Sequence, residues 1–598
     1  MLTTYRQLYA LLDLDERHQF HVLLVLVIVM AVIDTVGVAA VLPFLVVAAD
    51  PAVAHDSRFL ASLYAASGVT SDRAFVMLLG VVVFAFILLG LVVKILGQYR
   101  IIRFGHLRNH SLSRRLLQRY LRHPYAWFLN RNSADLGAAI LAECDKVVGT
   151  AMIPAMRVLA QSVSLLFLVG LLVIVSPAVA FSAAIGLAGA YGLIFLFVRR
   201  RLTRFGILQL AANAARHRIA LEAFGGIKDV KLMGLEGHYA ARYETPSRSF
   251  AESSAASQVI GELPRFLLEA VAFGGLVLMI LGLLILQDGR VQDILPVLGV
   301  FGFAVLKIFP AVQQIYHSLT QMRFIAPMLA KLHADLCEAG LPAEMQGPAQ
   351  PVTPVPLTDR LDLRNLRFSY PQTERATLGG LSLSIMARTT VGLVGGTGAG
   401  KTTAVDLILG LLAPDSGTIE VDGVPLTPAN MAAWQRSIGY VPQQIFLTDD
   451  SIAANIAFGV PPEVRDMAAV ERAARLAELH DFVIGELPQG YDTLVGERGV
   501  RLSGGQRQRI GIARALYRDP EVLILDEATS ALDSLTERAV MAAVTNLAHA
   551  KTIIMIAHRL TTVRVCDTIF LLQDGKLAAQ GSFDTLVAES EVFRRMAS

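Results

Sequence analysis

The chain has 598 residues, of which 54% are hydrophobic and 17% are charged, and its formal net charge is +3. Soluble globular domains carry about a quarter charged residues, so this composition, with a mean hydropathy of +0.52, argues against a soluble enzyme and predicts a membrane protein. The length exceeds that of a single ordinary domain. The three cysteines, Cys144, Cys337 and Cys566, match no metal-ligand spacing, so we expect thiols without a chemical role.

Six apolar runs are long enough to cross a bilayer, because a spanning helix needs about 20 mostly apolar residues. The first run lacks a small-residue cleavage pattern, so we interpret it as a retained span and not as a signal peptide. The third and fourth runs meet at Ser176-Pro177, which predicts a tight hairpin. The predicted spans are 20–48, 74–98, 152–175, 178–198, 264–286 and 294–318.

Arginine is concentrated in two of the segments that connect the spans. The segment from Arg100 to Arg131 holds eight arginines and no carboxylate before Asp135, and four more arginines lie at 199–204. The other two connecting segments mix Asp with Arg. The positive-inside rule therefore predicts that the Arg-rich segments and both termini are cytoplasmic.

Both Arg-rich segments are long and have helical character, which predicts helices that continue beyond the membrane. Each has a break in its middle, at 123–132 with Pro124 and at Gly225-Gly226. These breaks are either simple turns or short helices that dock onto another domain, and we favour the second interpretation. Residues 341–356 contain five prolines, which predicts a linker between a transmembrane domain at 1–340 and a second domain at 357–598.

From about Leu361, short β-branched strands alternate with helices, which predicts an α/β domain. A strand at 390–394 runs directly into a Gly-x4-Gly-Lys-Thr pattern, which is typical of a phosphate-binding loop. Its glycines let backbone N–H groups surround phosphates, and the following helix N-terminus adds positive dipole. Lys401 should reach the β- and γ-phosphates and Thr402 should ligate Mg²⁺. The predicted binding residues are Gly395, Gly396, Thr397, Gly398, Ala399, Gly400, Lys401, Thr402 and Thr403.

A second apolar strand, 522–525, ends in Asp526-Glu527. Such a pair lies at the carboxyl edge of a buried parallel strand, where ligands bind. We expect Asp526 to hold Mg²⁺, directly or through water, and Glu527 to polarise the attacking water as general base. The alternative is an ordinary strand end with solvated acids, which the nearby phosphate loop disfavours.

A second anion-binding helix start lies at Ser503-Gly504-Gly505-Gln506, ahead of the helical run 510–517. Taken together, the motifs resemble the ATPase domain of ABC transporters over 357–598, and Leu502 to Gln506 matches the signature sequence of that family. The resemblance implies further roles for single residues. They are Tyr370 stacking on adenine, Gln443 contacting Mg²⁺ and the attacking water, Asp533 in the D-loop, and His558 as the switch histidine near the γ-phosphate.

In that family the signature of one ATPase domain closes on the phosphate loop of another. The resemblance therefore implies that Ser503, Gly504, Gly505 and Gln506 contact the ATP of a partner, and that two copies pair head to tail around two ATP and Mg²⁺. ATP binding closes this homodimer and hydrolysis releases it, which requires different ATP affinities in the two states. No nucleic-acid partner is expected.

Six spans ahead of the ATPase domain resemble the exporter-type (type IV) half-transporters, and Gly496 to Gly499 fits their X-loop. The segments 33–37, 42–45 and 57–64 look like bacterial lipid-linked oligosaccharide flippases, whose outer loop carries a short interfacial helix. The resemblance implies an ATP-driven flippase in the bacterial inner membrane, in contact with membrane lipids. The alternatives are a general lipid or multidrug exporter and, from another class, a non-transporting ATP-gated membrane regulator. The intact catalytic set argues against the regulator.

Four basic residues lie within or at the ends of predicted spans. Ionisable groups at membrane depth usually face a cavity and mark function, and a cationic surface would suit a phosphate or pyrophosphate head group. Snorkelling to the interface is the alternative for Lys94 and Arg157, and Arg265 could pair with Glu262 or Glu269 on its own helix. The candidate substrate-contacting residues are Lys307, which is mid-span, Arg265, Lys94 and Arg157.

Overall fold

The computed structural model describes residues 2–49, 53–56, 58–69, 71–175, 177–286, 291–337, 353–370, 375–496, 499–527, 537–538, 541–542, 545, 547–557, 559–560 and 562–597. For most of 178–195 and 263–305 it describes the backbone only. The chain divides into two compact units. One comprises Met1–Leu121 and Arg131–Gly340, and the other comprises Arg122–Asn130 and Leu341–Ser598.

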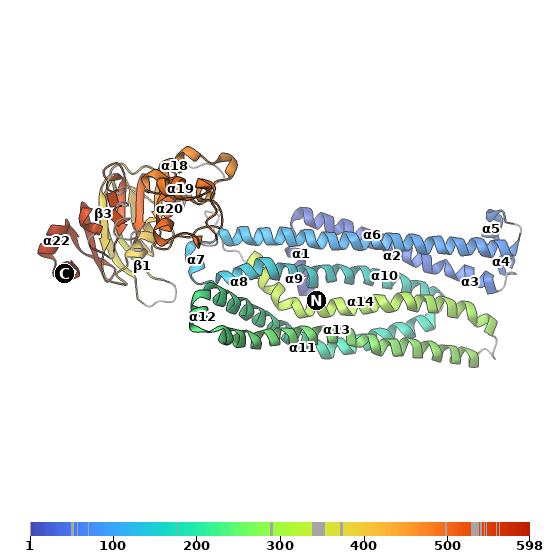
Figure 1. The fold of residues 1–598 in the computed structure, drawn as a ribbon. Helices are drawn as coiled ribbons and strands as arrows, with labels where there is room; N and C mark the ends of the chain where they lie inside the picture. The colour runs from blue at the N-terminus through green and yellow to red at the C-terminus, as the bar shows by residue number, and fades with distance from the viewer. Residues whose placement is uncertain are drawn as a thin grey trace. The chain divides into compact units, whose positions relative to one another are not determined.

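The described part of the first unit consists of helices, four of them very long (Figure 1). The longest has 51 residues, which corresponds to about 75 Å at 1.5 Å per residue. Because the hydrocarbon core of a bilayer is about 30 Å thick, such helices extend well beyond it, as predicted. The helices are α1 (Leu2–Ala10), α2 (Leu14–Ala39), α3 (Val41–Ala49), α4 (Val53–Asp56), α5 (Arg58–Ser67), α6 (Asp72–Leu121), α8 (Ser133–Ala138), α9 (Cys144–Val147), α10 (Ile153–Val175), α11 (Pro177–Gly225), α12 (Ile227–Met233), α13 (Glu236–Leu286) and α14 (Val291–Cys337).

Among the described residues, three helical stretches are long and apolar enough to cross a membrane: Leu14–Ala48, Asp72–Leu121 and Ser133–Ile174. The last includes two π-helical turns that lead into α10. The other three predicted spans fall within α11, α13 and α14, in regions where mostly backbone is described. Helix α2, which carries the first predicted span, begins earlier than that span, at Leu14, because the Glu16 carboxylate accepts a hydrogen bond from the Asp13 backbone N–H at 3.0 Å.

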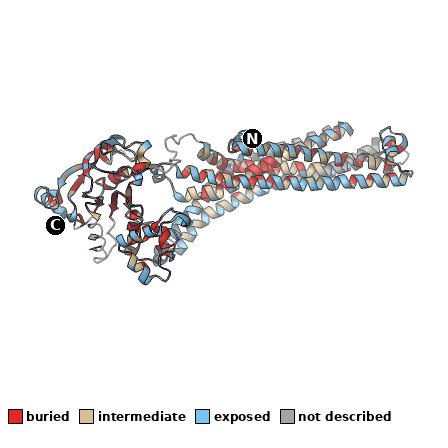
Figure 2. Cartoon of the chain, turned by 90° about the horizontal axis from the view of Figure 1, so that it is seen from above, coloured by how far each residue is buried: buried red, intermediate tan, exposed pale blue. Residues whose placement is uncertain are grey.

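The long helices pack along one another, α2 with α6 and α10, α10 with α14, and α11 with α13 and α14. Buried residues gather where the helices meet, while the outward sides of the helices are largely exposed (Figure 2). One buried ion pair ties two of these helices together, since Arg108 of α6 lies 2.8 Å from Glu16 of α2 and both side chains are less than 10% exposed. Its charges cancel within the apolar bundle, as a buried charge requires.

Both predicted breaks contain short helices. The first is α7 (Tyr125–Leu129), which starts after Pro124 and belongs to the second unit, where Ala126 packs against a hydrophobic core. The second is α12, which follows the Gly225-Gly226 break, lies in the first unit and ends at Gly234 in the left-handed conformation with φ 65°. Docking of α7 onto the second unit agrees with the interpretation that we favoured for this break.

The segment between the first two spans also forms a small structure of its own. Its helix α5 buries Leu60 in a cluster with Val47 and Phe75 and leaves Phe59 67% exposed. His55 Nε2 on α4 lies 3.1 Å from Asp72 Oδ1 at the start of α6, so this contact joins two parts of the segment. The short helix that the flippase resemblance implied for this loop is therefore present.

The described residues of the second unit form two sheets. The larger has the strand order β10-β9-β3-β8-β7-β6, in which β9, β3, β8, β7 and β6 are parallel, and the smaller has the antiparallel order β2-β1-β4-β5. The strands are β1 (Arg360–Phe368), β2 (Leu378–Met386), β3 (Thr390–Val394), β4 (Ser416–Val421), β5 (Val424–Pro425), β6 (Ile438–Val441), β7 (Val522–Asp526), β8 (Thr552–Ile556), β9 (Thr568–Gln573) and β10 (Lys576–Gly581). The helices are α15 (Lys401–Ile408), α16 (Pro428–Arg436), α17 (Ile452–Ile456), α18 (Met467–Leu476), α19 (His480–Glu486), α20 (Gly504–Leu516), α22 (Phe583–Glu589) and α23 (Glu591–Ala597).

Strands β3, β7 and β8 are buried along their whole length, which explains their uninterrupted apolar sequences. Because β8 lies between β3 and β7 in the parallel sheet, the carboxyl ends of β3 and β7 share one edge. The phosphate loop follows β3 and the Asp526-Glu527 pair ends β7, so the sheet brings these two motifs together as predicted.

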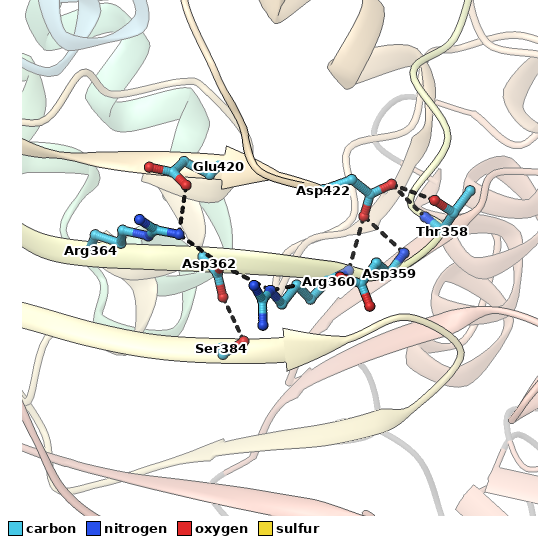
Figure 3. A network of polar contacts seen from close by, with 8 residues as sticks. All are labelled: Thr358, Asp359, Arg360, Asp362, Arg364, Ser384, Glu420 and Asp422. Carbon is cyan, nitrogen blue, oxygen red and sulfur yellow. Dashed lines mark hydrogen bonds and ion pairs between the residues drawn. The ribbon is translucent and has the colours of Figure 1, made fainter.

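A polar network fixes the start of this domain (Figure 3). The Asp422 carboxylate accepts hydrogen bonds from the hydroxyl of Thr358 at 2.7 Å and from the backbone N–H groups of Thr358, Asp359 and Arg360, each at 2.9 Å. Burial alone would raise the pKa of Asp422, but these hydrogen bonds outweigh it and lower the pKa. Residues 341–352 of the predicted linker lie outside the described residues. At its end, the Val355 carbonyl oxygen accepts a hydrogen bond from the Ser437 hydroxyl, so this residue is bound to the second unit.

Candidate functional site

The phosphate-binding loop connects the buried strand β3 to helix α15. Gly398 and Gly400 adopt φ of 79° and 95°, which residues with a side chain rarely adopt. A Cβ at Gly395 would lie 2.4 Å from the Leu572 carbonyl oxygen, so this position also requires glycine. The loop therefore has glycine at the positions where its backbone curls, as a phosphate-binding loop requires.

Lys401 is folded into this loop. Its ammonium donates to the carbonyl oxygens of Gly395 at 2.7 Å and Gly396 at 3.1 Å, and the residue is only 6% exposed. Burial lowers the pKa of Lys401, although the negative charges of Glu527 and Asp526 oppose that shift. The Lys401 charge thus interacts with the loop carbonyls and with the carboxylates of Asp526 and Glu527 at the edge of the sheet.

The acidic pair at the end of β7 has two distinct environments. Asp526 is 6% exposed and accepts a hydrogen bond of 3.4 Å from the Tyr440 hydroxyl. Glu527 has φ of 49°, a left-handed conformation that costs a residue with a side chain about 1–2 kcal/mol. Its backbone N–H is held by the Ile556 carbonyl at 3.1 Å. A strained backbone at a strand end is a frequent property of functional residues, and the sequence pattern did not predict it.

Gln443 meets Glu527 in this site. The Gln443 amide nitrogen donates a hydrogen bond of 2.8 Å to Glu527 Oε2. Gln443 follows β6, which pairs in parallel with β7, so the two strand ends bring the glutamine and the carboxylate together. The structure therefore joins the residue predicted to contact the attacking water with the residue predicted to activate it.

Tyr370 lies beside the same loop. Its hydroxyl is 3.2 Å from the Thr403 hydroxyl on α15, and its ring meets that of Phe368 edge to face at 5.0 Å. Asp406, which sequence reasoning missed, is on the same helix. Burial, followed by the charge of Asp526, raises the pKa of Asp406 to about 6. Its only signal in the sequence is an acidic residue within the apolar stretch after Lys401.

The signature forms a preorganised helix start. Ser503 caps α20, since the Gln506 N–H donates to Ser503 Oγ at 3.2 Å and the Ser503 N–H donates to Gln506 Oε1 at 2.8 Å. Gly504 and Gly505 open the helix as predicted, and Ser503 is exposed. The helix dipole is thus available to an anion that approaches from outside this unit.

Several predicted site residues fall outside the described residues. They are Asp533 of the D-loop, His558, and the central residues Glu497 and Arg498 of the X-loop segment. Thr397 of the loop and Thr402 in the first turn of α15 are exposed, whereas Ala399 of the loop is buried. The roles of all these residues in nucleotide binding remain predictions.

The first unit contains a polar cavity of about 370 Å³. Three of the four basic residues that we singled out line it, namely Lys94 of α6, Arg157 of α10 and Lys307 of α14. Their convergence favours the cavity interpretation over snorkelling. The backbone of Arg265 lies in α13, but its side chain is not among those described. The polar lining is completed by Asp34, Gln98, Gln161, Ser164 and Gln314.

Within this cavity Lys307 is paired with Asp34 of α2. Asp34 was not predicted as a site residue, although an acidic residue in an apolar span is a recognised signal. In the described part of the chain, Lys94 and Arg157 have no ion-pair partner, and Arg157 Nε is buried without a hydrogen bond. The Asp34 and Lys307 charges cancel, so the cavity keeps a net positive charge from the other two residues.

Comparisons with known proteins agree with this geometry. A family model described as ABC transporter matches residues 378–530, and one described as ABC transporter transmembrane region matches residues 20–304. The ATP-dependent lipid A-core flippase of Burkholderia orbicola is 32% identical over 502 residues, covering 82% of this chain and 82% of that protein. The protein of the same name from Pseudomonas fluorescens is 32% identical and covers 84% and 82%. A solved bacterial Atm1-family ABC exporter with ATP bound superposes with a TM-score of 0.79 at 25% identity, covering 98% of each chain.

Proposed function

The chain belongs to the ABC transporter family as a membrane-bound ATPase of the exporter type, and we propose that it moves an amphipathic glycolipid with a phosphate-bearing head group across the bacterial inner membrane. The observation that carries this proposal is the cavity in which Lys94 and Arg157 have no ion-pair partner among the described side chains and lie beside the Asp34–Lys307 ion pair. Two such cations suit a phosphate or pyrophosphate, which they bind by charge-assisted hydrogen bonds.

The residues of the nucleotide site support Mg²⁺-dependent hydrolysis. Bound Mg²⁺ neutralises the charge that develops on the β- and γ-phosphates, and the Thr402 hydroxyl and the Asp526 carboxylate would hold it. Lys401 orients the phosphates from within the loop. Glu527 accepts the proton of the attacking water, and the hydrogen bond from Gln443 fixes the direction of its carboxylate.

The site is complete only when a second copy is present. The capped and exposed start of α20 supports a head-to-tail homodimer in which Ser503 contacts the partner's ATP. The Arg-rich segments support an orientation with both termini in the cytoplasm, where ATP is available. In this arrangement the ATPase domains and the long helix extensions lie on the cytoplasmic side.

A lipid-linked oligosaccharide is the glycolipid that we propose. The similarity of the N-terminal segments to flippases of such lipids supports it, as does helix α5, with its exposed Phe59 and buried Leu60. The relatives are named as lipid A-core flippases, so lipid A-core is the competing cargo. Transport measurements with both lipids must therefore distinguish the two cargoes.

The decisive measurement is ATPase activity and lipid translocation by the full-length protein in liposomes. A polyprenyl-pyrophosphate oligosaccharide should stimulate both and should reach the outer leaflet only with ATP. Stimulation by lipid A-core alone would keep the phosphate-binding cavity but replace the proposed cargo. Stimulation by peptides or drugs alone would favour a multidrug exporter. Hydrolysis without movement of any of these compounds would favour the membrane regulator.

A further inference from the structure

A second cavity lies at the N-terminal end of the first unit and shares no lining residue with the polar cavity. It has a volume of about 160 Å³ and lies between α1, α2, α6 and the start of α10. Its walls are apolar, with Leu8, Phe20, Phe104, Ala155 and Leu159 among them. The hydroxyl of Tyr5, which also lines it, already donates to the Ala155 carbonyl oxygen at 3.1 Å.

The position of this cavity along the helices gives its depth. Phe20 is the first residue of the first predicted span, Phe104 lies six residues beyond the end of the second, and Ala155 is near the start of the third. The cavity therefore lies where the start of the first span, the end of the second and the start of the third come together. In the proposed orientation these are the cytoplasmic ends of all three spans. At this level head groups and acyl chains of the inner leaflet meet, while water is scarce a few ångströms deeper.

A guanidinium lies at the edge of the cavity. Arg17 Cζ is 4.8 Å from the ring centroid of Tyr9, and Arg17 Nε donates to the Leu12 carbonyl oxygen at 3.1 Å. Both Tyr9 and Leu12 line the cavity. Arg17 forms no ion pair with any of the residues that the structure describes. A cation and an apolar cavity are thus adjacent.

The acidic groups around this edge are either paired with another arginine or lie on a different side of the helix. Glu16 is paired with Arg108 at 2.8 Å, and Asp13 is paired with Arg115. Asp15 is two residues from Arg17, which places it about 200° around the helix. The guanidinium of Arg108 lies over the ring of Phe104 at 4.9 Å, but Glu16 neutralises it. Arg17 therefore contacts two lining residues, Tyr9 and Leu12, and has no acidic partner among the described residues. Arg6 and Arg103 are exposed residues of α1 and α6 that do not line the cavity.

Empty apolar cavities lose dispersion contacts, and water does not fill them without polar partners. At this depth the molecule available to fill the cavity is a lipid, whose acyl chain matches the walls. An anionic head group matches Arg17, because anionic lipids of the cytoplasmic leaflet attract basic groups near the surface. A zwitterionic lipid would bring an additional positive charge to the same place.

We propose that this cavity and Arg17 bind one anionic diacyl phospholipid of the inner leaflet, with the end of an acyl chain among Leu8, Phe104 and Ala155 and the phosphate on Arg17. The site is separate from the polar cavity that we assign to the transported glycolipid. The proposal rests on the orientation given under the proposed function and not on the identity of the cargo.

Native mass spectrometry of the full-length protein tests this site with phosphatidylglycerol and phosphatidylcholine of identical chains. The wild type should retain phosphatidylglycerol preferentially, and Arg17→Gln should weaken that retention by about tenfold, the value of one charge-assisted hydrogen bond. Arg6→Gln is the matched control. It also removes one positive charge, but from an exposed residue of α1 that does not line the cavity, so retention should be unchanged. Ala155→Trp fills the cavity and should weaken binding of both lipids.

Two further arms separate the sources of affinity. Lysophosphatidylglycerol should compete with the bound lipid, whereas soluble glycerophosphoglycerol, which has no acyl chain, should not. If Arg17→Gln fails to fold, Arg17→Lys should fold and keep the preference for the anionic lipid, and Ala155→Leu replaces the tryptophan variant in the same way. Equal retention of both lipids by the wild type, or unchanged retention in Arg17→Gln and in both cavity variants, would overturn the proposal. If the wild-type protein binds phosphatidylglycerol at this site but does not transport the glycolipid, the proposed function is wrong and this proposal stands.

Discussion

Gln443 and Glu527 are 84 residues apart in the sequence, and the amide of the first donates a 2.8 Å hydrogen bond to the carboxylate of the second. The parallel pairing of β6 with β7 brings their strand ends together. Glu527 is further constrained by its left-handed backbone, so the carboxylate has few directions available. A general base must lie within hydrogen-bond reach of its water, and this pair of contacts sets that geometry.

We expect Glu527→Gln to lower the ATPase rate by about 10²- to 10⁴-fold, the usual effect of a lost general base. ATP binding should persist, because Lys401 and the loop are unchanged, and the ATP-bound dimer should therefore accumulate in its closed form. Hydrolysis assays and retention of labelled ATP after gel filtration measure the two effects. Glu521→Gln, an exposed acid just before β7, is the control. Rapid hydrolysis in Glu527→Gln would refute the assigned role.

A composite ATP site makes a prediction about mixed dimers of Lys401→Ala and Ser503→Glu. With the two substitutions on different chains, one ATP site pairs two wild-type motifs and should stay intact. With both substitutions on one chain, each site contains one altered motif, and hydrolysis should fall to background. Doubly tagged and purified heterodimers allow the comparison. The reverse ranking would mean that each chain completes its own site.

The Asp34–Lys307 pair predicts opposite effects for its two members. Lys307→Ala removes a cation that can contact the head group, and should weaken the apparent affinity for an anionic glycolipid by about tenfold. Asp34→Asn removes the carboxylate that competes for Lys307, and should strengthen this affinity. Substrate-stimulated ATPase titrations measure both.

Asp72→Asn is the control for this pair, because Asp72 is an acid of the same helical unit that contacts His55 outside the cavity. Equal loss of affinity in Asp34→Asn and Lys307→Ala would show that the pair is a structural clamp between α2 and α14. A double substitution that restores neither effect would support the same conclusion.

The Asp422 network predicts a pH-dependent contribution to stability. Because the pKa of Asp422 is lowered in the folded state, its stabilising effect is complete above the ordinary carboxyl value of about 3.9 and is lost as pH falls through the lower folded value. Asp422→Asn should therefore destabilise the ATPase domain by about 1–3 kcal/mol at pH 5–8, and the difference from wild type should shrink below about pH 4.

Denaturation of the full-length protein followed by tryptophan fluorescence tests this prediction. Both tryptophans, Trp127 and the fully buried Trp434, belong to the second unit, so the signal reports on the ATPase domain. Asp449→Asn, at an exposed acid of the same domain, should leave the stability unchanged. A difference between wild type and Asp422→Asn that grows on acidification would contradict the assigned direction of the pKa shift.

The parts of this protein that the sequence by itself determined are local ones. Strand β3, the glycine loop and helix α15 follow from neighbouring residues, as do the acids that end β7 and the Ser503 cap of α20, because strand burial, glycine conformations and capping act over a few residues. The breaks around Pro124 and Gly225 follow for the same reason.

Other features were decided only by the tertiary structure. The contact between Gln443 and Glu527 depends on which strands are neighbours, and the left-handed backbone of Glu527 depends on how its N–H reaches Ile556. The convergence of Lys94, Arg157 and Lys307 on one cavity, with Asp34 as a partner, depends on how each long helix is rotated. Each residue advances about 100° around a helix, so only the packing of the bundle decides whether a charge in a span faces lipid or the cavity.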